Sequence, residues 1–276
     1  ANLEPLIQSI PVAPLKLASL EGCRTLADQV NNYLVSFRHE SPTNVGQADS
    51  LQGYCADSYL LECECPRFGS GEGKGVLKES ARGCDLFIMV DVTNYSLTYR
   101  VNGYENHMSP DNHYQDLKRI ISAADGKARR INVIMPFLYE GRQHKRSKRE
   151  SLDCALMLQE LVDMGVSNIL TFDAHDPRVS NSIPLHGFDS FMPTYQFLKA
   201  LVNSVPDFVI DNDHLMIISP DEGAMHRAVY FSNVLGVDMG MFYKRRDYST
   251  VINGKNPIVA HEFLGDDVTG KDVLIV

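Results

Sequence analysis

Short apolar runs alternate with amphipathic segments along most of the chain. In the first half, three runs are typical of buried strands: residues 86–90, 131–137 and 168–173. Residues 113–124 and 151–164 carry apolar side chains at helical spacing, and Gly165 follows the second of these as an expected helix cap. This half of the chain therefore predicts strands separated by helices.

The same alternation continues in the second half. Beyond residues 168–173, strands are predicted at residues 215–219, 237–243 and from 273 onward, and helices at residues 195–202 and 223–235. Alternation of this kind indicates parallel sheets covered by helices, an α/β fold. With 276 residues the chain is long for one domain. We predict two domains, residues 1–186 and 187–276, with the boundary in the region between Pro184 and Pro193.

Two polar stretches interrupt this pattern. Residues 93–112 are rich in Tyr, Asn, Gly and Pro, and residues 244–256 are rich in Lys, Arg, Asp and Gly. We expect both to be long loops. A long polar loop between strands is often functional.

Composition and charge narrow the class of protein. The formal net charge is −9, which disfavours a general nucleic-acid binder. No apolar run is long enough to cross a bilayer, and residues 1–14 lack the pattern of a secretory signal. The six cysteines form no pair with zinc-site spacing, so we expect reduced thiols in a cytoplasmic protein without nucleic-acid or membrane partners.

The most basic segment of the chain follows a predicted strand. Five Lys or Arg residues fall within residues 142–149, beginning with Arg142 and Gln143. Guanidinium groups suit phosphate oxygens, and Gln143 is suited to a base or sugar edge. The alternative is a solvated charge run at a helix start. Positive charge opposes the dipole at that end of a helix, which favours an anionic ligand such as a polyphosphate.

Two further strand ends carry acidic groups. Asp173 and His175 follow one predicted strand, where carboxylate and imidazole can hold a divalent metal, directly or through water. Asp221 follows another, between Ser219 and a helix that contains Arg227. The alternatives are a turn that hydrogen-bonds its own backbone for the first site and a simple helix cap for the second.

A cationic segment, residues 243–247, leads out of a later strand. Lys244 and Arg246 lie in it, and mobile cationic loops stabilise the charge on a transferring phosphoryl group. The alternative is an exposed loop. No Walker A, G-x-G-x-x-G or G-x-S-x-G pattern is found in the chain.

Taken in order, these segments resemble the ribose-phosphate pyrophosphokinases over residues 68–276. The matching segments are 68–72 (FGSGE), 79–85 (ESARGCD), 142–149 (RQHKRSKR), 173–175 (DAH), 219–227 (SPDEGAMHR), 244–246 (KRR) and 265–276 (GDDVTGKDVLIV). The respective family patterns are F-S-D-G-E, E-S-I-R-G-x-D, R-Q-D-[RK]-K, D-L-H, S-P-D-x-G-G…R, K-x-R and the strand before the sugar-phosphate loop. One such match is weak, but seven in the right order are specific.

The resemblance implies two phosphoribosyltransferase-like domains and transfer of the diphosphoryl group of Mg-ATP to ribose 5-phosphate. It also implies a homo-oligomer, a dimer or hexamer. The resemblance also implies a role for each site residue. Arg142 and Gln143 bind ATP, and Phe68 and Glu72 contact adenine from a neighbouring subunit. Asp173, His175 and Asp221 lie at Mg²⁺, Asp221 and Arg227 lie at the substrate, and Lys244 and Arg246 stabilise the transition state.

Four departures from the family pattern stand out. Ser70 replaces the acidic or amide residue of the first motif, and His144 replaces the Asp of R-Q-D. The stretch 93–112 is longer than the family's usual connection. The chain also ends at Val276, before the D-D-x-x-D-T-x-G loop that holds the sugar phosphate. An apolar strand is an unusual terminus, so we expect the natural protein to continue.

Two other functions compete with the enzyme. A non-catalytic subunit that assembles with active synthetase subunits fits Ser70 and His144, whereas the retained Lys244 and Arg246 favour catalysis. An ordinary phosphoribosyltransferase acting on a base does not need the basic segment, which disfavours it.

Overall fold

The computed structural model describes residues 11–40, 53–246 and 258–276, with the backbone alone at 244–246 and 258–261. The chain divides into two units, Ala1–Met192 and Pro193–Val276. The division follows strand β10 (Gly187–Phe191), which pairs with β9 (Val166–Phe172) in the first sheet. The boundary predicted after residue 186 would separate these two strands.

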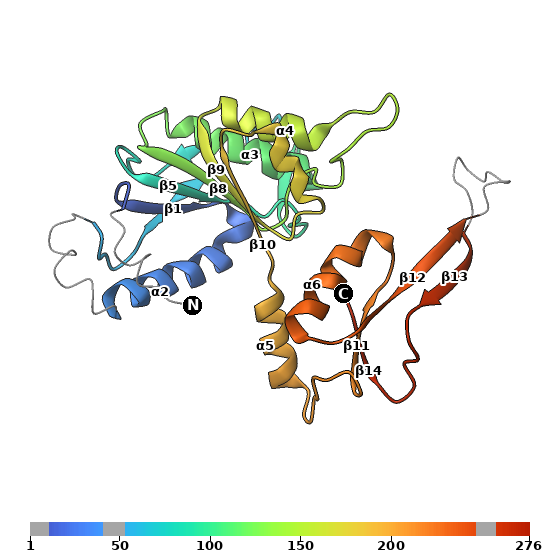
Figure 1. Cartoon of the computed structure of the whole chain (residues 1–276). Helices are drawn as coiled ribbons and strands as arrows, with labels where there is room; N and C mark the ends of the chain where they lie inside the picture. The colour runs from blue at the N-terminus through green and yellow to red at the C-terminus, as the bar shows by residue number, and fades with distance from the viewer. Residues whose placement is uncertain (1–10, 41–52, 247–257) are drawn as a thin grey trace. The chain divides into compact units, whose positions relative to one another are not determined.

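A parallel sheet forms the centre of the first unit (Figure 1). In the described residues its strand order is β10-β9-β8-β5-β1-β2, and every pairing is parallel. The strands not yet given are β1 (Leu15–Ser19), β2 (Leu60–Leu61), β5 (Asp85–Met89) and β8 (Arg130–Met135). Parallel strands need crossover connections, and helices α2 (Arg24–Glu40), α3 (Pro110–Ala123) and α4 (Asp153–Asp163) lie in these connections.

Different helices pack against the two faces of this sheet. Leu86 and Ile88 of β5 pack in one cluster with Leu117 of α3 and Leu158 of α4. Phe87 and Met89, which alternate with them, pack on the other face with Ala27 of α2. Because side chains alternate along a strand, β5 is apolar on both faces after Asp85. Helices cover both sides of the sheet, as Figure 1 shows.

Short antiparallel elements lie beside the sheet. Strands β3 (Cys63–Glu64) and β4 (Val76–Leu77) pair, and β6 (Thr98–Val101) pairs with β7 (Tyr104–His107). The second pair corrects the prediction of a loop at residues 93–112. Asn102 and Gly103, at φ values of 49° and 86°, form its turn, and Asn-Gly is a favoured hairpin sequence. Polar residues on both faces of this hairpin hid it from the hydrophobic pattern.

In the second unit, described by itself, four strands form a sheet in the order β13-β12-β11-β14. These are β11 (Leu215–Ser219), β12 (Met239–Arg246), β13 (Ile258–Leu264) and β14 (Asp272–Ile275). Strands β12 and β13 are antiparallel, whereas β11 runs parallel to β12 and β14. Helices α5 (Thr194–Ser204) and α6 (Met225–Leu235) share its core, in which Leu198 and Phe231 pack near Leu215.

Strand β12 corrects the second loop prediction. Residues 244–246 continue the strand, with Lys244 opposite His261, and residues 247–256 lie outside the described residues. No helix of the described residues is long and apolar enough to cross a membrane.

Candidate functional site

The segment after β8 begins with two tight turns. Gly141 N donates to Leu138 O at 3.1 Å, and Gln143 N donates to Glu140 O at 2.9 Å. A Cβ at position 141 would lie 3.0 Å from Leu138 O, so glycine permits this close turn. Together the turns bring Arg142 to the surface directly after the strand.

Gln143 holds the basic segment, residues 142–149, in a closed loop. Its side-chain nitrogen donates to Ser151 O at 2.8 Å and to Lys145 O at 3.3 Å. In the described part of the chain, Arg142 and the four cations at 145, 146, 148 and 149 form no ion pair, and all five are exposed. Exposed like charges without partners suit an anionic ligand.

Helix α3 supports the start of this segment. The rings of Tyr114 and Tyr139 stack with centroids 4.5 Å apart. The Tyr139 hydroxyl donates to Asp111 Oδ1 at 2.6 Å, and burial together with Asp111 raises the Tyr139 pKa. Tyr139 therefore fastens the turns before Arg142 to the first turn of α3.

The loop after β9 carries the predicted metal ligands. Asp173 has a φ of 42°, and its N–H donates to Phe191 O of β10 at 2.9 Å. A left-handed aspartate at a strand end is an uncommon conformation that neighbouring structure must hold in place. His175 is exposed two residues further on.

Pairing of β8 with β9 brings these two strand ends together. His144 Nε2 lies 3.7 Å from Asp176 Oδ2, and the His144 and His175 rings are 5.1 Å apart. Arg178 donates to Asp176 from its side chain, at 2.9 Å for Nε, and holds the pKa of that carboxyl well below its usual range. Asp176 belongs to the same strand end, residues 171–176, whose carboxylates and imidazole the sequence suggested for a metal, and in the structure it pairs with Arg178.

These donors fit a metal only in part. The described residues contain no group of three or more His, Cys, Asp or Glu side chains placed to hold an ion. Mg²⁺ usually takes one or two protein carboxylates and fills the rest of its shell with water and phosphate. The residue types of Asp173 and His175 are compatible with such a partial site, and Arg178 engages Asp176.

The 68–72 loop lies between β3 and β4. Phe68 N donates to Glu72 O at 2.7 Å, which closes the loop, and the Phe68 side chain is 55% exposed. Ser70 Oγ donates to Glu72 Oε2 at 2.8 Å. The residue that departs from the family pattern therefore orients the carboxylate expected to contact adenine.

In the second unit, Asp221 caps a helical turn. Its Oδ1 accepts from Ala224 N at 3.1 Å, and the buried Ser219 donates from Oγ to Asp221 O at 2.7 Å. The capping alternative is thus observed, and it engages one of the two carboxylate oxygens. Arg227 lies half-buried in the first turn of α6, and Lys244 and Arg246 lie at the end of β12.

Residues 15–165 match the family model described as the N-terminal domain of ribose phosphate pyrophosphokinase. The chain belongs to this family. Among curated family members, the ribose-phosphate pyrophosphokinase of Thermosipho africanus is 30% identical over 220 residues, covering 79% of this chain and 61% of that protein. The enzyme of Streptomyces coelicolor is 27% identical over 212 residues, covering 76% and 57%.

The fold agrees with family membership. A crystal structure of phosphoribosylpyrophosphate synthetase from Mycobacterium smegmatis superimposes with a TM-score of 0.62 at 20% identity, covering 89% of this chain and 67% of that one. The predicted phosphoribosyltransferase-like α/β fold is confirmed. The chain spans about three fifths of the length of its curated ribose-phosphate pyrophosphokinase relatives.

Proposed function

We propose that the protein transfers the diphosphoryl group of Mg-ATP to ribose 5-phosphate, giving phosphoribosyl pyrophosphate and AMP. The match of residues 15–165 to the family model carries the proposal. In this reaction the C1 hydroxyl oxygen bonds to the β-phosphorus and loses its proton. The bond from that phosphorus to the oxygen bridging it to the α-phosphorus breaks, and AMP leaves. Such transfers ask mainly for positioning and charge neutralisation.

The basic segment is the proposed ATP-binding element of the first unit. The exposed Arg142 guanidinium can donate two parallel hydrogen bonds to phosphate oxygens. Gln143 uses its side-chain nitrogen to close the loop, so its side-chain oxygen is the atom offered to the nucleotide. Both contributions hold the triphosphate for attack.

Asp173 and His175 are the residues of the first unit that would hold Mg²⁺, together with phosphate oxygens and water. When bound, the ion neutralises charge that develops on the phosphoryl oxygens. The chain's own contribution is the held conformation of Asp173, anchored through its N–H to Phe191 O.

The second unit would supply the remaining roles. Asp221 is proposed to face the metal-bound substrates, and Arg227 to bind substrate phosphate. Lys244 and Arg246 are proposed to stabilise the charge on the transferring group.

Phe68 and Glu72 are proposed to contact the adenine bound by a neighbouring subunit, which requires a homo-oligomer such as a dimer or hexamer. The exposed Phe68 ring is suited to stacking on a base, and the Glu72 carboxylate accepts hydrogen bonds from an amino group. We place the enzyme in the cytoplasm.

The test measures AMP formed from ATP with and without ribose 5-phosphate, using the full-length protein. Arg142→Ala, Lys244→Ala and Arg246→Ala should each lower kcat/KM by about 10²–10³. Lys16→Ala, which breaks only an exposed contact with Glu79 at 3.4 Å, should leave it unchanged. Full activity in all three variants would refute the assigned roles.

A non-catalytic subunit that regulates an active synthetase remains the second candidate. The observation that favours it is the contact of His144 with Asp176 at 3.7 Å, which places an imidazole where the family pattern has an aspartate. In that case the purified protein would form no AMP, and it would raise or lower the activity of an active synthetase with which it co-purifies.

A further inference from the structure

The β6–β7 hairpin contacts one side of the 68–72 loop. Asn102 N, in the hairpin turn, donates to Gly69 O at 3.0 Å. Gly71 has a φ of +92°, and a Cβ there would lie 2.8 Å from Val101 Cγ2. The loop therefore lies directly against the hairpin, at a position where only glycine fits without strain.

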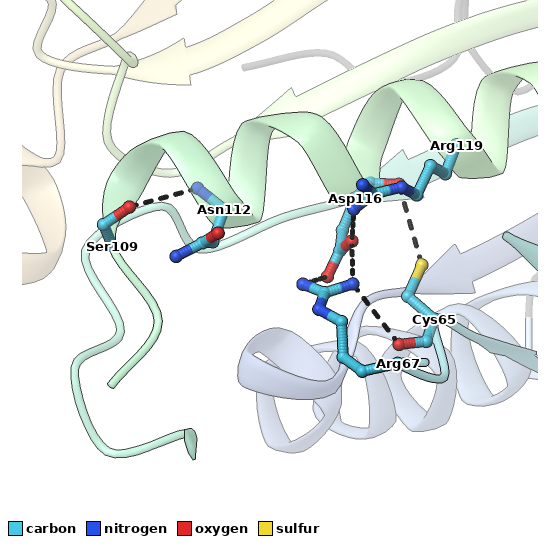
Figure 2. A network of polar contacts seen from close by, with 6 residues as sticks. All are labelled: Cys65, Arg67, Ser109, Asn112, Asp116 and Arg119. Atoms are coloured by element: carbon cyan, nitrogen blue, oxygen red, sulfur yellow. Dashed lines mark hydrogen bonds and ion pairs between the residues drawn. The ribbon is translucent and has the colours of Figure 1, made fainter. Parts of the chain in front are cut away.

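A buried ion pair fastens the other side of the loop to helix α3. Arg67, which directly precedes Phe68, donates to Asp116 through both terminal nitrogens, at 2.6 and 2.8 Å. Figure 2 shows these two hydrogen bonds between the facing side chains. The side chains of Arg67 and Asp116 are only 10% and 6% exposed. A bidentate pair of this kind fixes the direction of the guanidinium as well as its position.

Further contacts complete the network around Asp116. Arg119 donates to Asp116 Oδ1 at 2.6 Å, and the Arg67 guanidinium lies over the Tyr99 ring, 5.3 Å from its centroid. Cys65 accepts from Arg67 at 3.5 Å through its backbone oxygen (Figure 2). Asp116 thus accepts hydrogen bonds from two cations, Arg67 next to the loop and Arg119 on α3.

Two glycines let the chain leaving the loop approach α3 closely. A Cβ at Gly73 would lie 2.2 Å from Arg67 Nη1 and 3.0 Å from Arg119 Nη1. A Cβ at Gly75 would lie 2.4 Å from the Arg119 carbonyl oxygen. The loop is therefore held at both ends, by Arg67 before it and by Gly73 and Gly75 after it.

We propose that Asp116 is a positioning residue for nucleotide binding, which acts through Arg67 to hold Phe68 and Glu72 in the conformation that contacts adenine. The inference rests on the proposed function, because it takes the contact of the 68–72 loop with ATP as given. A buried ion pair gains little stability over an apolar pair of similar size, whereas its directional contacts define one geometry. Small misplacements of binding groups reduce binding strongly.

The experiment replaces the pair while keeping its site filled. In the full-length protein, Arg67→Met/Asp116→Leu substitutes apolar side chains of similar volume, and urea unfolding checks that it folds. Lys118→Gln is the matched control. Lys118 lies on the same helix, but its ion pair is with Glu160, at 2.9 Å, and it has no ion pair with the 68–72 loop among the described residues. We expect the KM for ATP to rise about tenfold, with the KM for ribose 5-phosphate and kcat changed less than about twofold. The control should match wild type.

Phe68→Ala separates the two hypotheses. It should raise the KM for ATP by a similar factor, and adding it to the double variant should cause little further change, because both act on one contact. If Phe68→Ala raises that KM and the double variant does not, Asp116 has no positioning role. If Phe68→Ala leaves the KM unchanged, the loop does not contact ATP, and both the assignment of Phe68 and the inference are overturned. Equal rises in both KM values in the double variant would also overturn the inference, because they indicate general structural damage.

Discussion

At the scale of single residues, Asp85 connects three strands of the first sheet. It is buried at the start of β5, and Arg130 and Asn132 of β8 donate to its Oδ1 at 2.8 and 2.7 Å. Asn168 of β9 then donates to Asn132 Oδ1 at 2.6 Å. A polar network of this kind stabilises only while every member has its partner.

We therefore predict that Asp85→Ala lowers the free energy of unfolding by about 3 kcal/mol, since Arg130 and Asn132 lose their acceptor. Urea denaturation measures this change. Lys16→Ala, which removes an exposed ion pair, should cost less than about 1 kcal/mol. Equal effects of the two substitutions would mean that burial of the network contributes nothing.

A second residue-scale prediction concerns acid stability. The pKa of Asp176 is depressed in the folded protein because Arg178 donates to its carboxylate. A depressed pKa contributes stability that is present above the unfolded-state value of about 3.9 and is lost as the pH falls below it. In the Arg178→Gln variant, the free energy of unfolding should therefore fall less between about pH 5 and pH 2 than it does in the wild type.

Unfolding at a series of pH values measures this loss. Arg146→Gln removes the same charge from the nearby basic segment without breaking an ion pair between described residues, and it should keep the wild-type acid slope. Identical slopes for Arg178→Gln and wild type would rule out the assigned coupling.

At the scale of elements, close backbone approaches decide which residues are tolerated. The chain before β4 passes against α3 at Gly75, where the nearest atom to an added Cβ is backbone and cannot rotate away. At Gly69, in the adjacent loop, an added Cβ meets nothing within 4 Å.

Gly75→Ala should accordingly destabilise the protein by about 2 kcal/mol through overpacking, whereas Gly69→Ala should change stability by less than about 0.5 kcal/mol. Thermal or urea unfolding distinguishes the two. A neutral Gly75→Ala would show that β4 can move away from α3 at little cost.

Helices and strands with clear apolar periodicity could be predicted from the sequence, and others could not. The strand at residues 215–219 was predicted with the bounds that the structure has, because residues 215–218 form a short uninterrupted apolar run. Helix α2 was missed because its described buried residues include Asn31, whereas Tyr33 and Phe37 are exposed. Where polar residues are buried and apolar ones exposed, the hydrophobic period carries little signal.

At the scale of the whole molecule, the proposed function makes activity depend on assembly. If Phe68 and Glu72 serve the nucleotide bound by a neighbouring subunit, each nucleotide site draws on two chains. The symmetric contacts of a homo-oligomer then determine how many sites are intact.

This can be tested by subunit mixing. Phe68→Ala/Glu72→Ala and Arg142→Ala should each be nearly inactive alone at low ATP concentration. Co-assembled in equal amounts, they should recover up to about a quarter of wild-type activity, because some sites pair an intact loop with an intact Arg142. AMP production from the mixed oligomer is the measurement. No recovery in a verified mixed oligomer would mean that the 68–72 loop and Arg142 of one chain serve the same site.

The sequence by itself determined the family, the α/β class and the strand ends at which chemistry is expected, because ordered motifs and apolar periods are local properties of the chain. Only the tertiary structure decided which of these ends adjoin. His144 reaches Asp176 because β8 pairs with β9, and Arg67 reaches Asp116 across 49 positions of sequence. An alternating pattern states which faces are buried but is compatible with several strand orders, so such long-range polar contacts follow only from the packed fold.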